Sequence, residues 1–296
     1  MADRDNADLL VETRVMGQVT SPELSGGVYA VDSSGLPFVP IGSGGIKYNV
    51  KVGMSAFGWA GDQVEPGVSL AHPQAAANAA LSTFACVGNT VQVRTGMAAG
   101  ALGTVTGKHE EFVTYQHVLV DFDEETLAKL CPGDQAVVRA HGTGLALADA
   151  SDVTLHSLDP GLWRKLTRPA RGQALVEIPV VAVVPPHLVG IGSGRLSAAT
   201  SICLQLGCRD DLGQLGLDDL RLGDLVAVTD WDGRYNTGYR PGAMLIGCVS
   251  TGTSRLAGYG PSLTILASGR GGQLGATIDP EANIARLLAV GTWRQP

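Results

Sequence analysis

The sequence predicts a mainly β protein in which an SH3-like small barrel is combined with additional β-sheet domains and a few short helices. Three observations support this class. The 296 residues include 40 glycines, and the charged fraction is 17%, which favours strands and turns over long solvated helices. Short β-prone segments alternate with Ser, Pro and Gly along the chain. Between Cys86 and Phe122 the order strand, glycine corner, strand, hairpin, strand is typical of a small closed barrel.

Residues 1–85 form the N-terminal β region of the predicted organisation. We expect short strands at residues 10–15, 27–31 and 38–41, each bounded by turn-forming residues. Residues 46–52 alternate apolar and polar side chains, which predicts a further strand. Residues 75–84 are poor in strand formers, so we expect a loop or a short helix there.

Residues 86–167 form the predicted barrel region. Residues 91–107 resemble the motif of SH3-like translation and transcription modules, which bind RNA through basic loops. The corresponding loop, residues 97–102, has no basic residue, so the resemblance supports the fold and not RNA binding. At the end of the region, residues 158–166 read as a short helix, because Asp159 can cap its start and Pro160 fits its first turn.

Residues 168–296 form a predicted C-terminal β-rich domain. The polar residues 168–173, with Pro and Gly, read as the linker before it. Residues 174–184 are an almost continuous apolar run, as expected of a buried central strand. Residues 279–290 read as a C-terminal helix.

Composition and charge narrow the function classes. The formal net charge is -7, which argues against nucleic acid and anionic membranes as partners, because both need clustered Lys and Arg. No stretch approaches the ~20 apolar residues of a membrane span, and the N-terminus is acidic where a secretory signal is basic. The five cysteines are odd in number and widely spread, so we expect reduced thiols and a cytoplasmic protein.

The densest polar cluster lies on the barrel hairpin. His117 and Asp121 share a face of the predicted strand 113–122, and His109 lies in the preceding turn, from which it could fold back toward His117. Such a set could bind zinc or another divalent ion. Alternatively, His109 and His117 act as acid–base groups tuned by a neighbouring carboxylate or by Lys108, or they are ordinary polar residues of a hairpin.

A second candidate is the glycine-rich segment 58–67. Asp62 and Glu65 flank an irregular stretch near Trp59, and paired carboxylates beside an aromatic wall suit acid–base chemistry if burial separates their pKa values. The alternative is a turn whose acids bind backbone amides.

Other features carry weaker signals. The glycine loop 190–195 could bind an anion, but it lacks the endings of the known nucleotide loops, so no cofactor is evident. Cys248 is a candidate nucleophile, with a buried strand cysteine as the safer interpretation.

Several segments resemble a family of uncharacterised bacterial and archaeal proteins known mainly from structural genomics, with representatives from thermophiles. The segments run nearly end to end: residues 46–53 (IKYNVKVG), 58–69 (GWAGDQVEPGVS), 86–89 (CVGN), 105–109 (VTGKH), 117–120 (HVLV), 178–182 (IPVVA), 192–194 (GSG), 222–227 (LGDLVA) and 239–243 (YRPGA).

The resemblance implies a multi-part β fold with an SH3-like barrel and a homo-oligomer, but no reaction. This chain departs from the family pattern in lacking two glycines after His109 and in carrying Tyr259 at a histidine position. A second histidine near residues 248–251 and an acid near Ser201 are also replaced. These departures imply a diverged pocket or a different reaction, in a specialised biosynthetic pathway.

Two hypotheses follow. In the first, the chain is a small-molecule enzyme, a hydrolase, lyase, isomerase or cyclase, with acid–base groups drawn from Tyr48, Lys51, Asp62, Glu65, His109 and His117. In the second, it is a non-catalytic ligand-binding or oligomeric scaffold protein.

Overall fold

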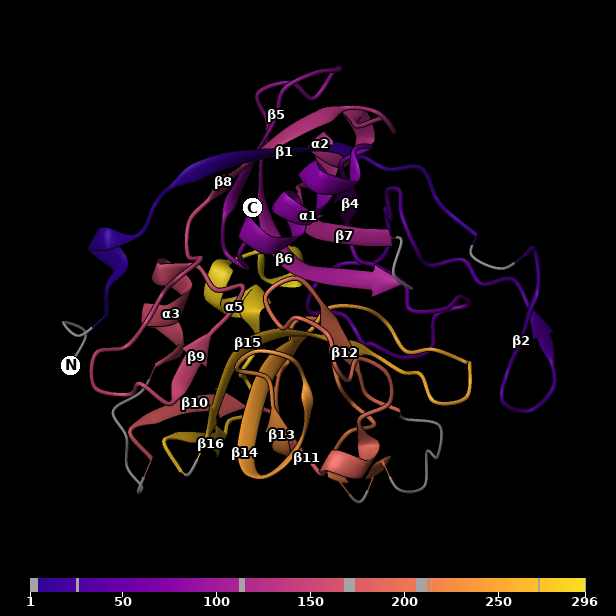
Figure 1. Cartoon of the computed structure of the whole chain (residues 1–296). Helices are drawn as coiled ribbons and strands as arrows, with labels where there is room; N and C mark the ends of the chain where they lie inside the picture. Colours follow the sequence, from indigo (N-terminus) through magenta and orange to yellow (C-terminus); the bar gives the residue numbers. More distant parts are fainter. Residues whose placement is uncertain are drawn as a thin grey trace.

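The computed structural model describes residues 5–24, 27–111, 115–167, 174–205, 212–213, 215–270 and 272–295. Two β structures are stacked in it, a barrel above and a larger sheet below, and β2 projects from the side of the body (Figure 1). The predicted linker, 168–173, lies outside the described residues. None of the described helices is long and apolar enough to span a membrane.

A closed barrel forms the upper half, which confirms the predicted mainly β fold with a small barrel. Its strands, in spatial order, are β1 (Thr13–Val19), β4 (Val68–Ala71), β7 (Tyr115–Asp121), β6 (Leu102–Glu111), β5 (Thr90–Val93) and β8 (Gln135–Ala140). Fully buried valines, among them Val91, Val105, Val118 and Val120, fill the interior. The strands come from both sides of residue 85, because β1 and β4 complete the barrel.

The lower half contains a six-stranded sheet and a smaller parallel pair. The sheet follows the order β11 (Ala182–Val184), β13 (Leu225–Asp232), β14 (Gly238–Val249), β15 (Ser262–Arg270) and β12 (Ser201–Cys203), with β9 (Val153–Leu155) also paired to β15. The pair consists of β10 (Val176–Val180) and β16 (Leu274–Ile278). In Figure 1, β6 runs along the junction between the two halves.

Two predicted strands are wrong in detail. Residues 174–184 do not form one central strand: the chain leaves the β10–β16 pair at Val180 and enters the edge of the larger sheet as β11. Apolar content indicates burial, and most side chains of both strands are buried, so the composition does not show where one strand ends and the next begins. Residues 46–52 form a loop with only an isolated bridge from Ile46 to Val68, because positive-φ glycines at 44, 45 and 53 turn the chain on both sides.

Helices are short, and they cover the ends and sides of the sheets. Those that lie wholly within the described residues are α1 (Ala75–Phe84), α2 (Glu124–Lys129), α3 (Pro160–Leu166) and α5 (Ile284–Leu288), with 3-10 turns η1 (Ala7–Leu9), η2 (Pro186–Leu188) and η3 (Gly291–Trp293). The C-terminal helix is shorter than predicted and begins after Asn283, whose side chain accepts a hydrogen bond from the Ala285 amide.

The start of α3 follows the prediction from its sequence. The Asp159 carboxylate accepts hydrogen bonds from the amides of Gly161 and Leu162, at 2.7 and 3.3 Å, and Pro160 occupies the first turn. Asp159 also accepts a hydrogen bond from the Asn89 amide at 3.0 Å. One carboxylate therefore caps the helix and ties it to the barrel.

We predict that Asp159→Ala lowers the free energy of unfolding by about 1–2 kcal/mol, because the helix loses its cap and the Asn89 amide loses its acceptor. Urea unfolding measures the change. The exposed Asp8, which lies in the 3-10 turn η1, provides the control Asp8→Ala, for which we expect a change within about 0.5 kcal/mol. Equal effects of the two substitutions would contradict the assignment.

Candidate active site

A buried carboxylate shared by two imidazoles forms the centre of the candidate site. Glu65 is fully buried, and its Oε1 lies 2.6 Å from Nδ1 of His109 and 2.9 Å from Nδ1 of His117. Its Oε2 accepts hydrogen bonds from the Gly44 amide at 2.7 Å and the Ser69 hydroxyl at 2.5 Å. Both carboxylate oxygens are therefore satisfied, as a buried charge requires.

The β6–β7 hairpin positions the two histidines. His109 and His117 are direct partners in the antiparallel register, so their side chains emerge side by side on one face. The prediction that His109 lies in a turn is wrong, because β6 continues through it to Glu111. A register irregularity between Val105 and Gly107 precedes this part of the hairpin, and bulges of this kind re-aim the side chains that follow.

The loop before β4 brings Glu65 onto this face. Gly44 has φ of 69°, and a Cβ there would lie 2.4 Å from the Ser21 carbonyl oxygen. Only glycine fits a left-handed position with such a close neighbour, and the same residue supplies the amide that binds Glu65. The glycine-rich composition of this loop thus serves the carboxylate directly.

Glu65 and His117 stabilise each other's charged forms. Burial alone would raise the pKa of the Glu65 carboxyl, but the charge of His117 and the hydrogen bonds from both histidines hold it well below the usual value. Burial alone would lower the pKa of His117, and the Glu65 carboxylate outweighs this and raises it. His117 is therefore held as an imidazolium beside an ionised carboxylate.

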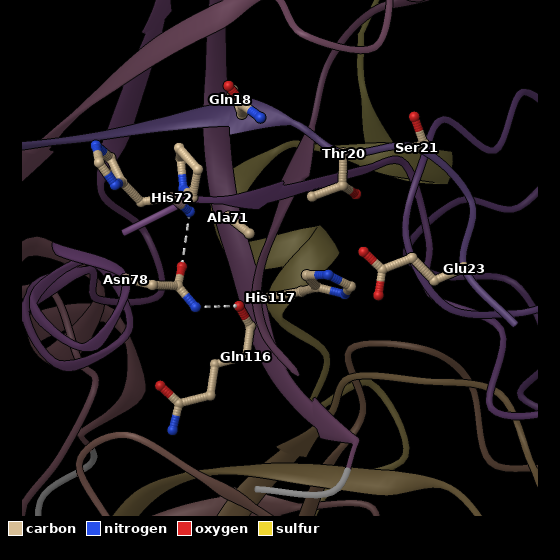
Figure 2. Close-up of a pocket in the computed structure, with 10 residues that line it drawn as sticks. Gln18, Thr20, Ser21, Glu23, Ala71, His72, Asn78, Gln116 and His117 are labelled. Carbon is tan, nitrogen blue, oxygen red and sulfur yellow. Dashed lines mark hydrogen bonds between the residues drawn. The ribbon is translucent and has the colours of Figure 1, made fainter. Parts of the chain in front are cut away.

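His117 lies at the edge of a pocket of about 390 Å³. Figure 2 shows the ring of His117 facing the carboxylate of Glu23, with Thr20 and Ser21 on the adjoining segment. The full lining is Gln18, Thr20, Ser21, Glu23, Ala71, His72, Pro73, Asn78, Gln116 and His117. The pocket wall is polar, and among the lining residues none is Lys, Arg or aromatic other than the histidines.

Asn78 of α1 fixes one wall of the pocket. Its side-chain oxygen accepts a hydrogen bond from the His72 amide at 2.8 Å, and its amide donates to the Gln116 carbonyl at 3.1 Å. Both contacts are drawn in Figure 2. They tie the helix to the end of β4 and to β7 next to His117, so the wall is rigid where it meets the imidazole.

The structure brings together Glu65, His109 and His117 of the six predicted acid–base residues. Tyr48 is 59% exposed, and Lys51 forms a surface ion pair with Glu124. Neither lines the pocket.

Asp62 does not pair with Glu65. Its carboxylate accepts hydrogen bonds from the Ser254 hydroxyl at 2.6 Å and the Arg255 amide at 3.0 Å, so it orders a loop of the C-terminal half. This matches the alternative interpretation of the segment, a turn whose acids bind backbone amides.

The predicted metal set does not assemble. Asp121 binds the Arg294 guanidinium and the Gly291 amide, and the two histidines direct Nδ1 to Glu65 instead. In the part of the chain that the structure describes, no three His, Cys, Asp or Glu side chains converge in a way that could hold a metal ion. The Nε2 of His109 is buried and has no hydrogen-bond partner there.

Of the two groups proposed to tune His109, a carboxylate or Lys108, the structure places the carboxylate of Glu65 beside the ring. Alternation along β6 turns Lys108 away, and its Nζ donates to the Ser157 hydroxyl at 2.8 Å and the Ala198 carbonyl at 2.7 Å. Its side chain is only 1% exposed, and burial lowers the pKa of Lys108 to about 8. Lys108 therefore links the barrel to the lower half.

Cys248 and the positions that depart from the family pattern are not among the residues that line this pocket. Burial raises the pKa of the Cys248 thiol to about 12, which leaves it protonated and inert as a nucleophile. Ser201 pairs with Thr264 between β12 and β15. Neither residue lines the pocket.

Sequence reasoning missed Glu23, Ser69 and Asn78. Glu23 follows Ser21 and Pro22 in a segment that reads only as a turn, and Asn78 lies in a stretch of alanines. The sole signal was the presence of a polar side chain within an apolar or turn-forming segment, which is too common to select a site.

The chain is a mainly β protein in which a barrel sits on a sheet and a carboxylate–imidazole cluster lies beside a polar pocket. Family models match this chain over most of its length. Residues 29–164 match the N-terminal part and residues 166–288 the C-terminal part of DUF4438, a domain of unknown function. The chain belongs to this family, which confirms the resemblance seen in the sequence.

A solved relative has the same fold. The crystal structure of TM1086, a Thermotoga protein, is 40% identical and superposes with a TM-score of 0.89, covering 96% of this chain and 98% of that one. A search of the curated proteins finds no match.

We predict that Glu65→Gln lowers the free energy of unfolding by about 3–5 kcal/mol, because it leaves a buried imidazolium without its counter-charge. The stability that ionised Glu65 contributes is present above its ordinary pKa of 4.5 and is lost as the pH falls through the lowered value. The stability from His117 is present below its ordinary 6.5 and is lost as the pH rises through the raised value. The loss of stability caused by Glu65→Gln is therefore largest between pH 4.5 and pH 6.5.

Urea unfolding across this pH range measures the effect. The matched control is Glu124→Gln, which breaks the exposed pair with Lys51 and should cost much less stability than Glu65→Gln at every pH. A Glu65→Gln variant whose loss of stability does not vary with pH would contradict the charge assignment.

For Lys108 we predict a contribution to stability that rises with pH, opposite in sign to that of His117. The pKa of Lys108 falls from 10.5 to about 8 on folding, so the unfolded chain binds more protons between these values and the wild type gains stability as the pH rises. Lys108→Met lacks this gain, so the wild type should become more stable relative to Lys108→Met as the pH rises above 8. Lys129→Met, at a half-exposed helix position, should follow the wild type. Parallel pH profiles for wild type and Lys108→Met would refute the prediction.

Proposed function

We propose that this chain is a small-molecule enzyme of the isomerase or lyase type that works by acid–base chemistry in its polar pocket. One observation supports this above all: His117 shares a buried carboxylate through Nδ1 and also lines the pocket. Carboxylate–imidazole pairs of this kind orient the ring and stabilise its protonated form. His117 is the proposed proton donor.

Glu23 is the proposed proton acceptor. Its carboxylate faces His117 across the pocket in Figure 2, and its charge contributes to raising the pKa of His117. A carboxyl side chain that faces an imidazole across a pocket suits the removal of a proton from one atom of a ligand and the delivery of a proton to another.

The lining favours a small neutral ligand rich in hydroxyl and carbonyl groups. The volume of about 390 Å³ lies at the small end of ligand sites. Hydroxyl, carboxamide and imidazole groups supply donors and acceptors, whereas the lining has no Lys or Arg to hold a phosphate and no large aromatic wall for an apolar ligand. A sugar-like or hydroxycarbonyl compound fits these properties.

The proposed step is a proton transfer next to a carbonyl group. Glu23 removes the proton from the carbon beside the carbonyl, and His117 gives its Nε2 proton to the carbonyl oxygen, which forms an enol. Glu23 then gives its proton to the former carbonyl carbon, and the neutral His117 takes the proton of the hydroxyl group on the neighbouring carbon. That carbon becomes the new carbonyl, which completes an isomerisation. If His117 instead protonates a hydroxyl group on the next carbon, that group leaves as water and the reaction is an elimination.

The alternative is a ligand-binding protein without catalysis. The observation that favours it is the second imidazole: His109 also donates to Glu65 yet is only 2% exposed and does not line the pocket. In this case the cluster would be a rigid support for the pocket wall.

We also propose a cytoplasmic location. The described cysteines, Cys86, Cys131, Cys203 and Cys248, are free thiols, which supports a reducing compartment.

The test is incubation of the protein in D₂O with a panel of aldoses, ketoses and hydroxylated lactones, followed by NMR. We expect deuterium incorporation or conversion that falls at least about 100-fold in His117→Gln and in Glu23→Gln and that declines as the pH rises through the pKa of His117. Tyr48→Phe, at an exposed residue that does not line the pocket, should keep full activity.

Each other outcome decides against part of the proposal. Binding at the pocket without exchange supports the ligand-binding alternative. Exchange that survives both substitutions overturns the roles of His117 and Glu23. A panel that neither binds nor reacts overturns the neutral ligand class.

A further inference from the structure

An arm of exposed apolar residues projects from the body. Residues 27–41 include β2 (Ala30–Val31) and β3 (Pro37–Phe38), which pair only with each other. Figure 1 shows β2 at the far side of the molecule, away from the barrel and the sheet. A two-stranded hairpin of this size is not stable by itself in water, so something outside it must hold it.

The body holds the arm through Arg255 and at its base, where the Asp62 amide donates to the Ile41 carbonyl at 3.0 Å. Arg255 donates to the Asp32 carboxylate at 2.8 Å and lies over the Phe38 ring, 4.7 Å from its centroid. Its carbonyl accepts a hydrogen bond from the Ser33 amide at 3.0 Å. These contacts fix the turn of the arm but leave its other side chains uncovered.

The uncovered side chains are large and apolar. Six of them are exposed: Val28 60%, Tyr29 70%, Val31 60%, Leu36 59%, Val39 47% and Ile41 56%. The only charged residue in the arm is Asp32, and it is already paired with Arg255. Exposed strands in monomeric proteins are protected by charges that prevent edge pairing, and this arm has no such charge to spare.

We propose that the arm binds a second copy of this chain. Covering the six side chains would bury on the order of 600 Å² per copy, most of the roughly 800 Å² per partner of a standard interface. The absence of a free charge matches the apolar, charge-poor core of homodimer interfaces. A surface of this kind must be covered wherever the chain is dissolved, and another copy is the partner that is always present.

The contact centres on residues 28–31. Pro37 and Pro40 remove backbone donors from the β3 side of the arm, whereas residues 28–31 keep all of theirs. Antiparallel pairing of this segment with itself across a two-fold axis gives a closed, self-complementary dimer.

Sedimentation equilibrium and native mass spectrometry of the full chain test the proposal. We expect a dimer for the wild type and an increase of at least about 100-fold in the dissociation constant when Tyr29 and Val31 are both replaced by lysine. Met97→Lys, at a side chain that is 84% exposed outside the arm, is the matched control and should remain dimeric. Circular dichroism confirms that each variant folds.

Amide hydrogen exchange of the wild type gives a second measurement that needs no variant. The amides of residues 28–31 should exchange more slowly at high than at low protein concentration. A monomeric wild type, a double variant with unchanged affinity, or exchange at residues 28–31 that is independent of concentration would each overturn the proposal.

Discussion

The shared carboxylate of Glu65 is the interaction on which the rest of this site depends. A fully buried charge is tolerable only when it is paired and hydrogen-bonded, and Glu65 obtains its partners from three separate parts of the chain: the hairpin histidines, the Gly44 amide and the Ser69 hydroxyl. All of these partners therefore stabilise the same buried carboxylate. The orientation of His117 toward the pocket follows from the need to pair this charge.

The short segment that contains Gln63 and Glu65 also joins the two halves of the molecule. Gln63, two residues before Glu65, has φ of 41°, a conformation that is uncommon and costly outside glycine. Its amide donates to the Cys203 thiol, the Gly260 carbonyl and the Ser262 hydroxyl, all in the lower half. Gln63 thus faces the lower sheet and Glu65 faces the barrel hairpin. The strain at Gln63 is offset by buried hydrogen bonds on both sides of the segment.

Local features of the fold could be predicted from the sequence, and contacts between distant segments could not. The cap at Asp159 and the glycine corners of the barrel act within a few residues, so spacing alone reveals them. In contrast, residues 46–52 have the alternation of a strand, but the turns at Gly44 and Gly53 decide their path. Glu65 and the two histidines were selected separately as polar residues in unusual places, and only the fold shows that they meet. Asp62 gave the same signal and serves a loop instead.

The base of the arm lies against the site, which connects the two proposals. The Glu23 amide donates to the Ser43 carbonyl at 3.1 Å, so the segments that enter and leave the arm are hydrogen-bonded to each other. Next to this bond, the Gly45 amide donates to the Thr20 hydroxyl and the Gly44 amide binds Glu65. Glu23 and Thr20 are pocket-lining residues. Fixing the arm against a second copy would therefore restrict the pocket wall that faces His117, and the dimer would present a more rigid site than the single chain.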